Sequence, residues 1–305
     1  NRSPAGREGG MNMRRSMLFL PGNTPNIIMN ADVLGADSVI LDLEDAVAPD
    51  QKDAARILVR NTLKTMKFQD CEVIVRINPL SSGEWQQDLE EIIPYRPAII
   101  MPTKISCSQD VQQIAAYMGT VEKKAGNPVG STRIMPLIET ARGVENSYHI
   151  AEADPRVCAI FIGCEDLTAD LCCERTKAGN EVFYARSRVV CAARAAGIDV
   201  YDTPFTDIND GEGLRKDAAF AKGLGYTGKA CISPRQVDIV NEVFSPSEED
   251  IAYARMVFEA IEEGKKLGRG AVALHGKMID KPIVDRAAHV LEMASHMKKE
   301  VFPDD

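Results

Sequence analysis

Short apolar runs alternate with amphipathic segments from Met17 to about Phe244. The apolar runs are Met17–Leu20, Ser38–Leu43, Glu72–Ile77, Ala98–Met101, Arg133–Ile138, Val157–Ile162, Ile198–Tyr201 and Gly228–Ile232. Continuous apolar runs separated by helix-like segments indicate parallel strands that are buried on both faces of a sheet. Eight repeats of this unit predict a (β/α)₈ barrel, the TIM barrel, over residues 13–245.

The segments between the runs have the period of amphipathic helices. They are Asn26–Leu34, Gln51–Lys67, Glu84–Ile93, Gln109–Ala125, Gly143–Ala153, Glu181–Ala196, Asn209–Leu224 and Pro234–Phe244. An open doubly wound sheet is the alternative arrangement of such units, and it normally has a glycine-rich phosphate turn after its first strand. Here Leu20-Pro21-Gly22-Asn23 occupies that position, so the barrel is favoured.

The two ends of the chain depart from this pattern. Residues 1–12 are rich in Gly, Ser and Arg, match neither a signal peptide nor a membrane anchor, and are expected to be a disordered or artificial lead. Residues 246–305 begin with a strong helix start and are expected to form two helices, to about Leu267 and over Pro282–Lys299. We predict that this extension lies beyond the barrel, where it covers a rim or reaches a neighbouring subunit.

Composition narrows the class of protein. The 305 residues are 45% apolar and 27% charged, which is ordinary for a soluble globular chain. The net charge of −9 argues against nucleic acid or an anionic membrane as the main partner. None of the eight cysteines forms a C-x-x-C pair, which predicts no disulfide framework, no zinc site and a reducing, cytoplasmic location.

The fifth and sixth predicted strands are each followed by carboxylates. Glu139 follows the run Arg133–Ile138, and Glu165 and Asp166 follow the run Val157–Ile162. Residues at the carboxyl ends of neighbouring parallel strands meet on one face of a barrel, and that face carries the active site of TIM barrels. Carboxylates there suit Mg²⁺, which takes one or two of them together with waters and substrate. A helix cap at Glu139 and a turn at Asp166 fit the same sequence.

Arg76 stands within the run Glu72–Ile77, among Val and Ile. A buried guanidinium needs a carboxylate partner, because an unpaired one would be very costly. The partner is either an internal acid such as Glu44 or Asp45, or a substrate carboxylate held bidentately. A metal site beside Arg76 favours the substrate carboxylate as its partner.

Three acids close the second strand, at Asp42, Glu44 and Asp45. They can bind the metal, orient its waters or pair with an arginine, and we expect Glu44 and Asp45 to support the metal site from outside. Lys104, at the end of the fourth strand, is expected to be an exposed lysine.

Several motifs resemble a known family. They are Arg14-Arg15-Ser16-Met17-Leu18-Phe19-Leu20-Pro21-Gly22, Val39-Ile40-Leu41-Asp42-Leu43-Glu44-Asp45-Ala46-Val47, Val75-Arg76-Ile77-Asn78-Pro79, Ile138-Glu139-Thr140-Ala141, Gly163-Cys164-Glu165-Asp166-Leu167, Phe183-Tyr184-Ala185-Arg186 and Gly276-Lys277-Met278-Ile279-Asp280. Their order and content are similar to the HpcH/HpaI aldolase family, which holds citrate lyase β subunits and the malyl-CoA and citramalyl-CoA lyases. The resemblance extends from Arg14 over nearly the whole chain.

The resemblance implies a TIM barrel and Mg²⁺-dependent cleavage of a carbon–carbon bond in a 3-hydroxyacyl thioester. It implies that Glu139 and Asp166 bind the metal and that Arg76 holds a substrate carboxylate. Arg15 and Glu139 are also expected to contact the substrate. Asp280 would serve as acid and base in the active site of a neighbouring subunit, which implies a homotrimer or a multiple of one.

Within the family, Asn180–Arg186 and Tyr201–Asn209 are most similar to citrate lyase β subunits. These act on citryl thioester carried by an acyl-carrier protein, in a complex with α and γ subunits. We therefore expect citryl-ACP or citryl-CoA to be cleaved to oxaloacetate and an acetyl thioester. A stand-alone citramalyl-CoA or malyl-CoA lyase and a non-catalytic scaffold barrel are the alternatives. His275 departs from the Asp or Asn common at its position, which leaves the hydrogen bonding of that segment open.

Overall fold

A computed structural model describes residues 13–266, 273–274 and 277–301. The chain divides into two compact units, one spanning Arg14–Phe244 and the other beginning at Ser245. The lead at residues 1–12 and the pair His275 and Gly276 lie outside the described residues.

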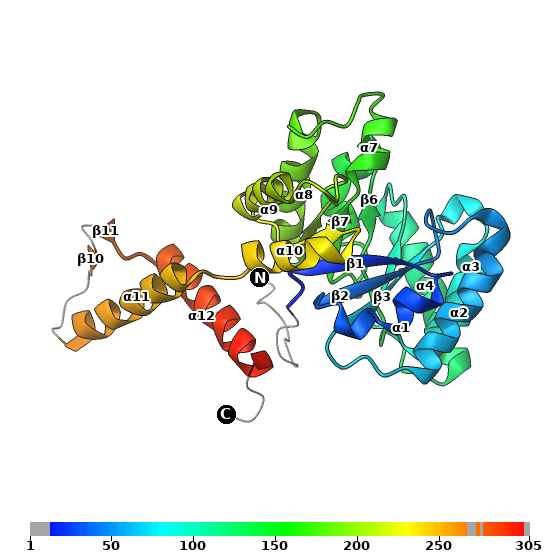
Figure 1. Ribbon diagram of the computed structural model, residues 1–305, viewed down its shortest axis with the longest axis horizontal. Helices are drawn as coiled ribbons and strands as arrows, with labels where there is room; N and C mark the ends of the chain where they lie inside the picture. Colours follow the sequence, from blue (N-terminus) through cyan, green and yellow to red (C-terminus); the bar gives the residue numbers. More distant parts are fainter. Residues whose placement is uncertain (1–12, 267–272, 275–276, 302–305) are drawn as a thin grey trace. The chain divides into compact units, whose positions relative to one another are not determined.

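The first unit is built on one parallel sheet (Figure 1). Its strands are β1 (Ser16–Pro21), β2 (Ser38–Asp42), β3 (Glu72–Ile77), β4 (Ile99–Pro102), β5 (Arg133–Ile134), β6 (Leu137–Ile138), β7 (Ala159–Ile162), β8 (Asp199–Asp202) and β9 (Gly228–Cys231). They are paired in the order β5-β4-β3-β2-β1-β9-β8-β7-β6. Every expected apolar run therefore contributes a strand.

The segment that holds β5 and β6 closes the sheet. Residue Ile134 in β5 pairs with Ile100 of β4 on one side and bridges to Val157 on the other, and β6 pairs with β7. Pro136 has no N–H to donate, so it interrupts the strand and divides it in two. Counting β5 and β6 as one position gives the eight strands of a barrel, and the predicted (β/α)₈ fold is confirmed.

Helices follow the strands. They are α1 (Pro25–Met29), α2 (Lys52–Thr65), α3 (Trp85–Ile92), α4 (Ser108–Ala125), α5 (Ala141–Glu145), α6 (Ser147–Ala151), α7 (Cys164–Asp170), α8 (Phe183–Ala196), α9 (Gly211–Leu224) and α10 (Val237–Phe244). The single helix expected over Gly143–Ala153 is split into α5 and α6. Helix α7 was not expected, and it begins directly after β7.

The core has two layers, because successive strand residues point to opposite faces. One layer fills the barrel interior and includes Ile40, Ile74, Met101, Phe161 and Tyr201. The other layer lies between the strands and the surrounding helices. The apolar side chains on both faces explain why the strands read as continuous hydrophobic runs.

The second unit contains helices α11 (Glu248–Lys266) and α12 (Lys281–Val301) and an antiparallel pair, β10 (Ala273–Leu274) with β11 (Lys277–Met278). Both helices were expected. Ser247 and Asp250 cap α11 reciprocally: the Ser247 Oγ accepts from the Asp250 N–H at 3.0 Å, and Asp250 Oδ2 accepts from the Ser247 N–H at 3.0 Å. Among the described residues, no helix is both long enough and apolar enough to cross a membrane.

Candidate active site

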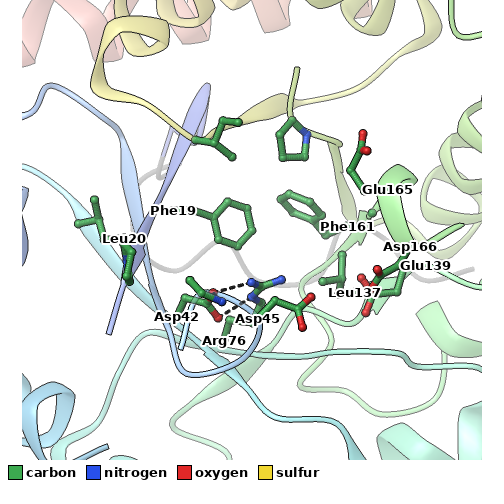
Figure 2. A pocket seen from close by; sticks show the side chains of 15 residues that line it. Phe19, Leu20, Asp42, Asp45, Arg76, Leu137, Glu139, Phe161, Glu165 and Asp166 are labelled. Carbon is green, nitrogen blue, oxygen red and sulfur yellow. Dashed lines mark hydrogen bonds and ion pairs between the residues drawn. The ribbon is translucent and has the colours of Figure 1, made fainter. Parts of the chain in front are cut away.

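A cavity of about 310 Å³ lies at the carboxyl ends of the barrel strands (Figure 2). It is lined by Phe19, Leu20, Pro21, Asp42, Asp45, Ala46, Arg76, Leu137, Glu139, Phe161, Gly163, Glu165, Asp166, Pro204 and Ile232. These residues come from strands of the barrel and from the segments that follow strands. The position agrees with the face on which TIM barrels carry their active sites.

Arg76 enters this cavity from β3. It is in register with Asp42 of β2, and its Nε and Nη2 donate to the two carboxylate oxygens of Asp42 at 2.7 and 2.5 Å. Glu44 Oε2 lies 3.1 Å from Nη1, and the guanidinium lies 4.9 Å from the centre of the Phe19 ring. The internal partner of Arg76 is therefore chiefly Asp42, and the arginine still lines the cavity.

Glu139 follows β6 and is 4% exposed. Its Oε1 accepts from the backbone N–H of Lys104 at 2.9 Å. The cap of α5 is Thr140, whose hydroxyl accepts from Gly143 N–H at 3.0 Å, so Glu139 does not have the capping role. A Cβ at Gly163 would lie 2.8 Å from Glu139 Oε2, so glycine at that position leaves room for the carboxylate.

Asp166 lies in the first turn of α7, and Figure 2 shows its carboxylate beside that of Glu139. Burial, and then the negative charges of Asp166 and Glu44, raise the pKa of Glu139 to about 8. The positive charge of Arg76 and the backbone N–H of Lys104 act in the opposite direction and lower this pKa. The Lys104 ammonium lies beside the other two carboxylates, with Nζ 3.2 Å from Glu44 Oε1 and 3.5 Å from Asp166 Oδ2.

The donor set fits a hard divalent cation. Glu139 and Asp166 offer oxygen atoms, and the adjoining cavity has room for waters and substrate, which complete the coordination of Mg²⁺ in proteins. In the part of the chain that is described, no group of three or more His, Cys, Asp or Glu side chains has metal-binding geometry. Water and substrate would supply the remaining ligands of a cation bound between these two carboxylates.

The structure brings together Arg76, Glu139 and Asp166, with Glu44 and Asp45 beside them. It does not bring Arg15 to the cavity. Arg15 precedes β1, at the opposite end of the barrel, and its Nη2 lies 2.7 Å from Asp37 Oδ1. We therefore leave Arg15 out of the proposed site.

Asp280 belongs to the second unit. Its Oδ1 accepts from the backbone N–H of Ile283 at 3.1 Å, at the start of α12. The side chain is exposed. Its assignment to a neighbouring active site stays a prediction.

Lys104 is the site residue that sequence reasoning underestimated. The segment Met101-Pro102-Thr103-Lys104 placed it at a strand end, which was the available signal. Its contact with two carboxylates that follow different strands depends on barrel closure and on a left-handed backbone, with φ of 54°. Neither feature can be read from the local sequence.

The fold and the site together define an α/β-barrel enzyme with an arginine and paired carboxylates at its strand ends. A family model, HpcH/HpaI aldolase/citrate lyase, matches residues 15–234. The chain belongs to this family, and it is a lyase.

Relatives support this assignment over most of the chain. It is 40% identical over 283 residues to citrate lyase subunit beta of Leuconostoc mesenteroides, covering 93% of this chain and 94% of that protein. It is 32% identical over 298 residues to the mitochondrial citramalyl-CoA lyase of Homo sapiens, covering 94% and 87% of the two. The crystal structure of protein CitE from Mycobacterium tuberculosis with magnesium, acetoacetate and coenzyme A superposes with a TM-score of 0.77 at 32% identity, covering 95% and 99%.

Proposed function

We propose that the protein is a Mg²⁺-dependent lyase that cleaves a citryl thioester, citryl-ACP or citryl-CoA, to oxaloacetate and an acetyl thioester. The observation that carries the proposal is the pair of carboxylates, Glu139 and Asp166, beside Arg76 in one cavity. The magnesium bound in the Mycobacterium tuberculosis structure and the similarity to citrate lyase beta subunits support it.

Glu139 and Asp166 would hold the cation. When bound, Mg²⁺ lowers the pKa of a coordinated hydroxyl and stabilises negative charge on its oxygen. The N–H donors of Arg76 that are not directed at Asp42 or Glu44 are suited to a substrate carboxylate. Apolar walls at Phe19, Leu137 and Phe161 limit the water beside the reacting bond, which strengthens these electrostatic contacts.

The reaction is a retro-aldol-type cleavage. Loss of the hydroxyl proton lets the oxygen form the ketone of oxaloacetate, while the electrons of the broken carbon–carbon bond pass to the α-carbon of the acetyl thioester. That carbon then takes up a proton. We assign the proton transfers to Asp280 of a neighbouring subunit, because a carboxylate is competent as both base and acid.

The first experiment measures the release of the keto acid (oxaloacetate, pyruvate or glyoxylate) with Mg²⁺ and with EDTA, from citryl-carrier protein, citryl-CoA, citramalyl-CoA and malyl-CoA. Metal-dependent release from either citryl substrate supports the proposal. A clear preference for citryl-carrier protein would favour assembly with α and γ subunits. Pyruvate from citramalyl-CoA alone, or glyoxylate from malyl-CoA alone, would reassign the substrate, and no cleavage of any would contradict the proposed activity.

Arg76→Ala is expected to raise KM and lower kcat, reducing kcat/KM by about 100-fold, because an oriented carboxylate contact is lost. The substitution also leaves Asp42 buried without its guanidinium. Arg76→Lys keeps a positive charge beside Asp42 but lacks the bidentate fork, so it serves as the matched control for folding. Steady-state kinetics test the prediction, and an unchanged kcat/KM in Arg76→Ala would remove Arg76 from the site.

Asp280→Asn is expected to lower kcat by about 100-fold or more with KM and Mg²⁺ affinity unchanged. Asparagine also caps helices, so the start of α12 should be kept. Mixing Asp280→Asn with Arg76→Ala subunits tests whether Asp280 acts across subunits, because a mixed oligomer would rebuild some complete sites. Activity above that of either variant supports this role, whereas normal turnover of Asp280→Asn alone would contradict it.

A further inference from the structure

Lys104 has an unusual backbone conformation for a lysine. Its φ is 54°, in the left-handed region, where a residue with a Cβ is strained by about 1 kcal/mol or more. The same turn points the Lys104 N–H at Glu139 Oε1, 2.9 Å away. The strained residue is therefore fixed to one of the two carboxylates proposed to hold the cation.

The side chain of Lys104 contacts the second of these carboxylates. Its Nζ lies 3.5 Å from Asp166 Oδ2 and 3.2 Å from Glu44 Oε1. Lys104 thus joins an acid that follows β2 to an acid in α7. Its side chain is 39% exposed and that of Asp166 is 40% exposed, so the Lys104–Asp166 contact can break without creating a buried unpaired charge.

The two positive groups of the site differ in what holds them. Arg76 is bound bidentately by Asp42, which is 1% exposed. Lys104, by contrast, has a flexible side chain that lies between two acceptors. Among the described residues, Lys104 is the cation that forms an ion pair with Asp166.

We propose that Lys104 is a built-in counter-ion that competes with the divalent cation for Asp166 and so sets the metal affinity of the site. In the cation-free protein its ammonium offsets the repulsion between Asp166 and Glu44. When a divalent cation binds Asp166, the ammonium withdraws and remains with Glu44. This inference rests on the proposed function, since it assumes that Glu139 and Asp166 hold the metal.

The test is isothermal titration of Mg²⁺ into the full chain, without substrate, for the wild type and three variants. Lys104→Met removes the charge, keeps the length of the side chain and retains the N–H to Glu139. It is expected to bind Mg²⁺ roughly 5- to 10-fold more tightly, since a competing charge within about 4 Å is gone. Lys104→Arg keeps the charge and is expected to bind Mg²⁺ no more tightly than the wild type.

Lys177→Met is the matched control. Lys177 also joins two carboxylates, with Nζ 2.7 Å from Asp207 Oδ2 and 2.8 Å from Asp210 Oδ2, but none of the three lines the cavity. The Lys177→Met variant should bind Mg²⁺ with the same affinity as the wild type. A melting curve in EDTA adds a second readout. Lys104→Met should have a lower melting temperature than the wild type, because Asp166 and Glu44 repel one another without the ammonium. Added Mg²⁺ should raise its melting temperature by more than it raises that of the wild type.

Unchanged or weaker Mg²⁺ binding by Lys104→Met would overturn the inference, as would equal tightening in Lys104→Arg or Lys177→Met. Each result would show that the charge of Lys104 does not compete for the metal. A wild-type protein that binds no Mg²⁺ would overturn the proposed metal site itself. The failure of the inference and the failure of the proposed function are therefore distinguishable.

Discussion

Asp202→Asn is expected to lower the free energy of unfolding by about 3–5 kcal/mol, because it breaks a buried ion pair from one side. Asp202 ends β8 and is fully buried, as are Lys229 and Arg186. Its Oδ2 accepts from Lys229 Nζ at 2.6 Å and from Arg186 Nη2 at 2.7 Å. Asparagine fills the same volume, so the loss comes from charge and not from a cavity. Two buried cations would then share the single charge of Asp217.

Glu242→Gln provides the control. Glu242 pairs with Arg215 at 2.8 Å, but both side chains are exposed, and solvent screens such a pair so that it contributes little to stability. Urea unfolding of the full chain measures both variants. A loss for Asp202→Asn as small as that for Glu242→Gln would show that the buried network contributes no net stability to the barrel.

The same network is connected by hydrogen bonds to the candidate active site. Lys229 Nζ also donates to the Thr203 carbonyl at 2.7 Å, and the Thr203 hydroxyl accepts from the Cys164 N–H at 3.0 Å. Cys164 is the first residue of α7, which carries Asp166. These contacts form a chain that runs from Asp202 through Lys229 and Thr203 to the start of α7. The Asp202→Asn substitution should therefore also displace Asp166 and weaken Mg²⁺ binding.

The barrel could be predicted from the sequence because its signal is repeated along the chain. Each strand is buried on both faces, so each reads as an apolar run, and an error at one position does not change the count. Local details were not accessible in this way. Helix α7 was missed because Gly163-Cys164-Glu165-Asp166 fits a strand end as well as a helix start. Lys229 lies within the expected apolar run Gly228–Ile232, and its buried role was not predicted because its partners, Asp202 and Asp217, are distant in sequence.

The candidate site could be predicted in part, for a topological reason. Parallel strands bring their carboxyl ends to one face, which was enough to place Arg76, Glu139 and Asp166 together. Pairing within the site depends on register, so the sequence alone did not single out Asp42 as the main partner of Arg76. Arg15 precedes its strand, and the same topology places it at the other end of the barrel.

Glu139→Gln is expected to abolish stabilisation by Mg²⁺ and to reduce kcat by about 1000-fold or more, because one of the two proposed carboxylate ligands is lost. The glutamine side chain would keep an oxygen able to accept the Lys104 N–H, so the fold should be retained. Melting curves with and without Mg²⁺ measure the loss of binding, since a ligand that binds only the folded chain raises its stability.

The pH dependence of stability in the cation-free protein distinguishes a metal-binding role of Glu139 from a structural one. Burial, Asp166 and Glu44 raise the pKa of Glu139 from 4.5 to about 8. Between these values the folded protein retains a proton that the unfolded chain has released, so this group lowers stability as pH rises from about 4.5 to about 8. Glutamine resembles the protonated form. In EDTA, Glu139→Gln should therefore match the wild type near pH 4, below the unfolded-state pKa, and exceed it in stability near pH 8.5.

Added Mg²⁺ is expected to reverse the order of stability of the wild type and Glu139→Gln. Binding requires the ionised carboxylate, so the affinity of the wild type for Mg²⁺ should rise with pH up to about 8 and then level off. With saturating Mg²⁺ at about pH 8.5, the wild type should be more stable than Glu139→Gln. The test is a set of melting curves at both pH values, with EDTA and with Mg²⁺. If Glu139→Gln were less stable than the wild type in EDTA at the higher pH, Glu139 would be a structural acid with its own internal partner and not a ligand kept for a cation.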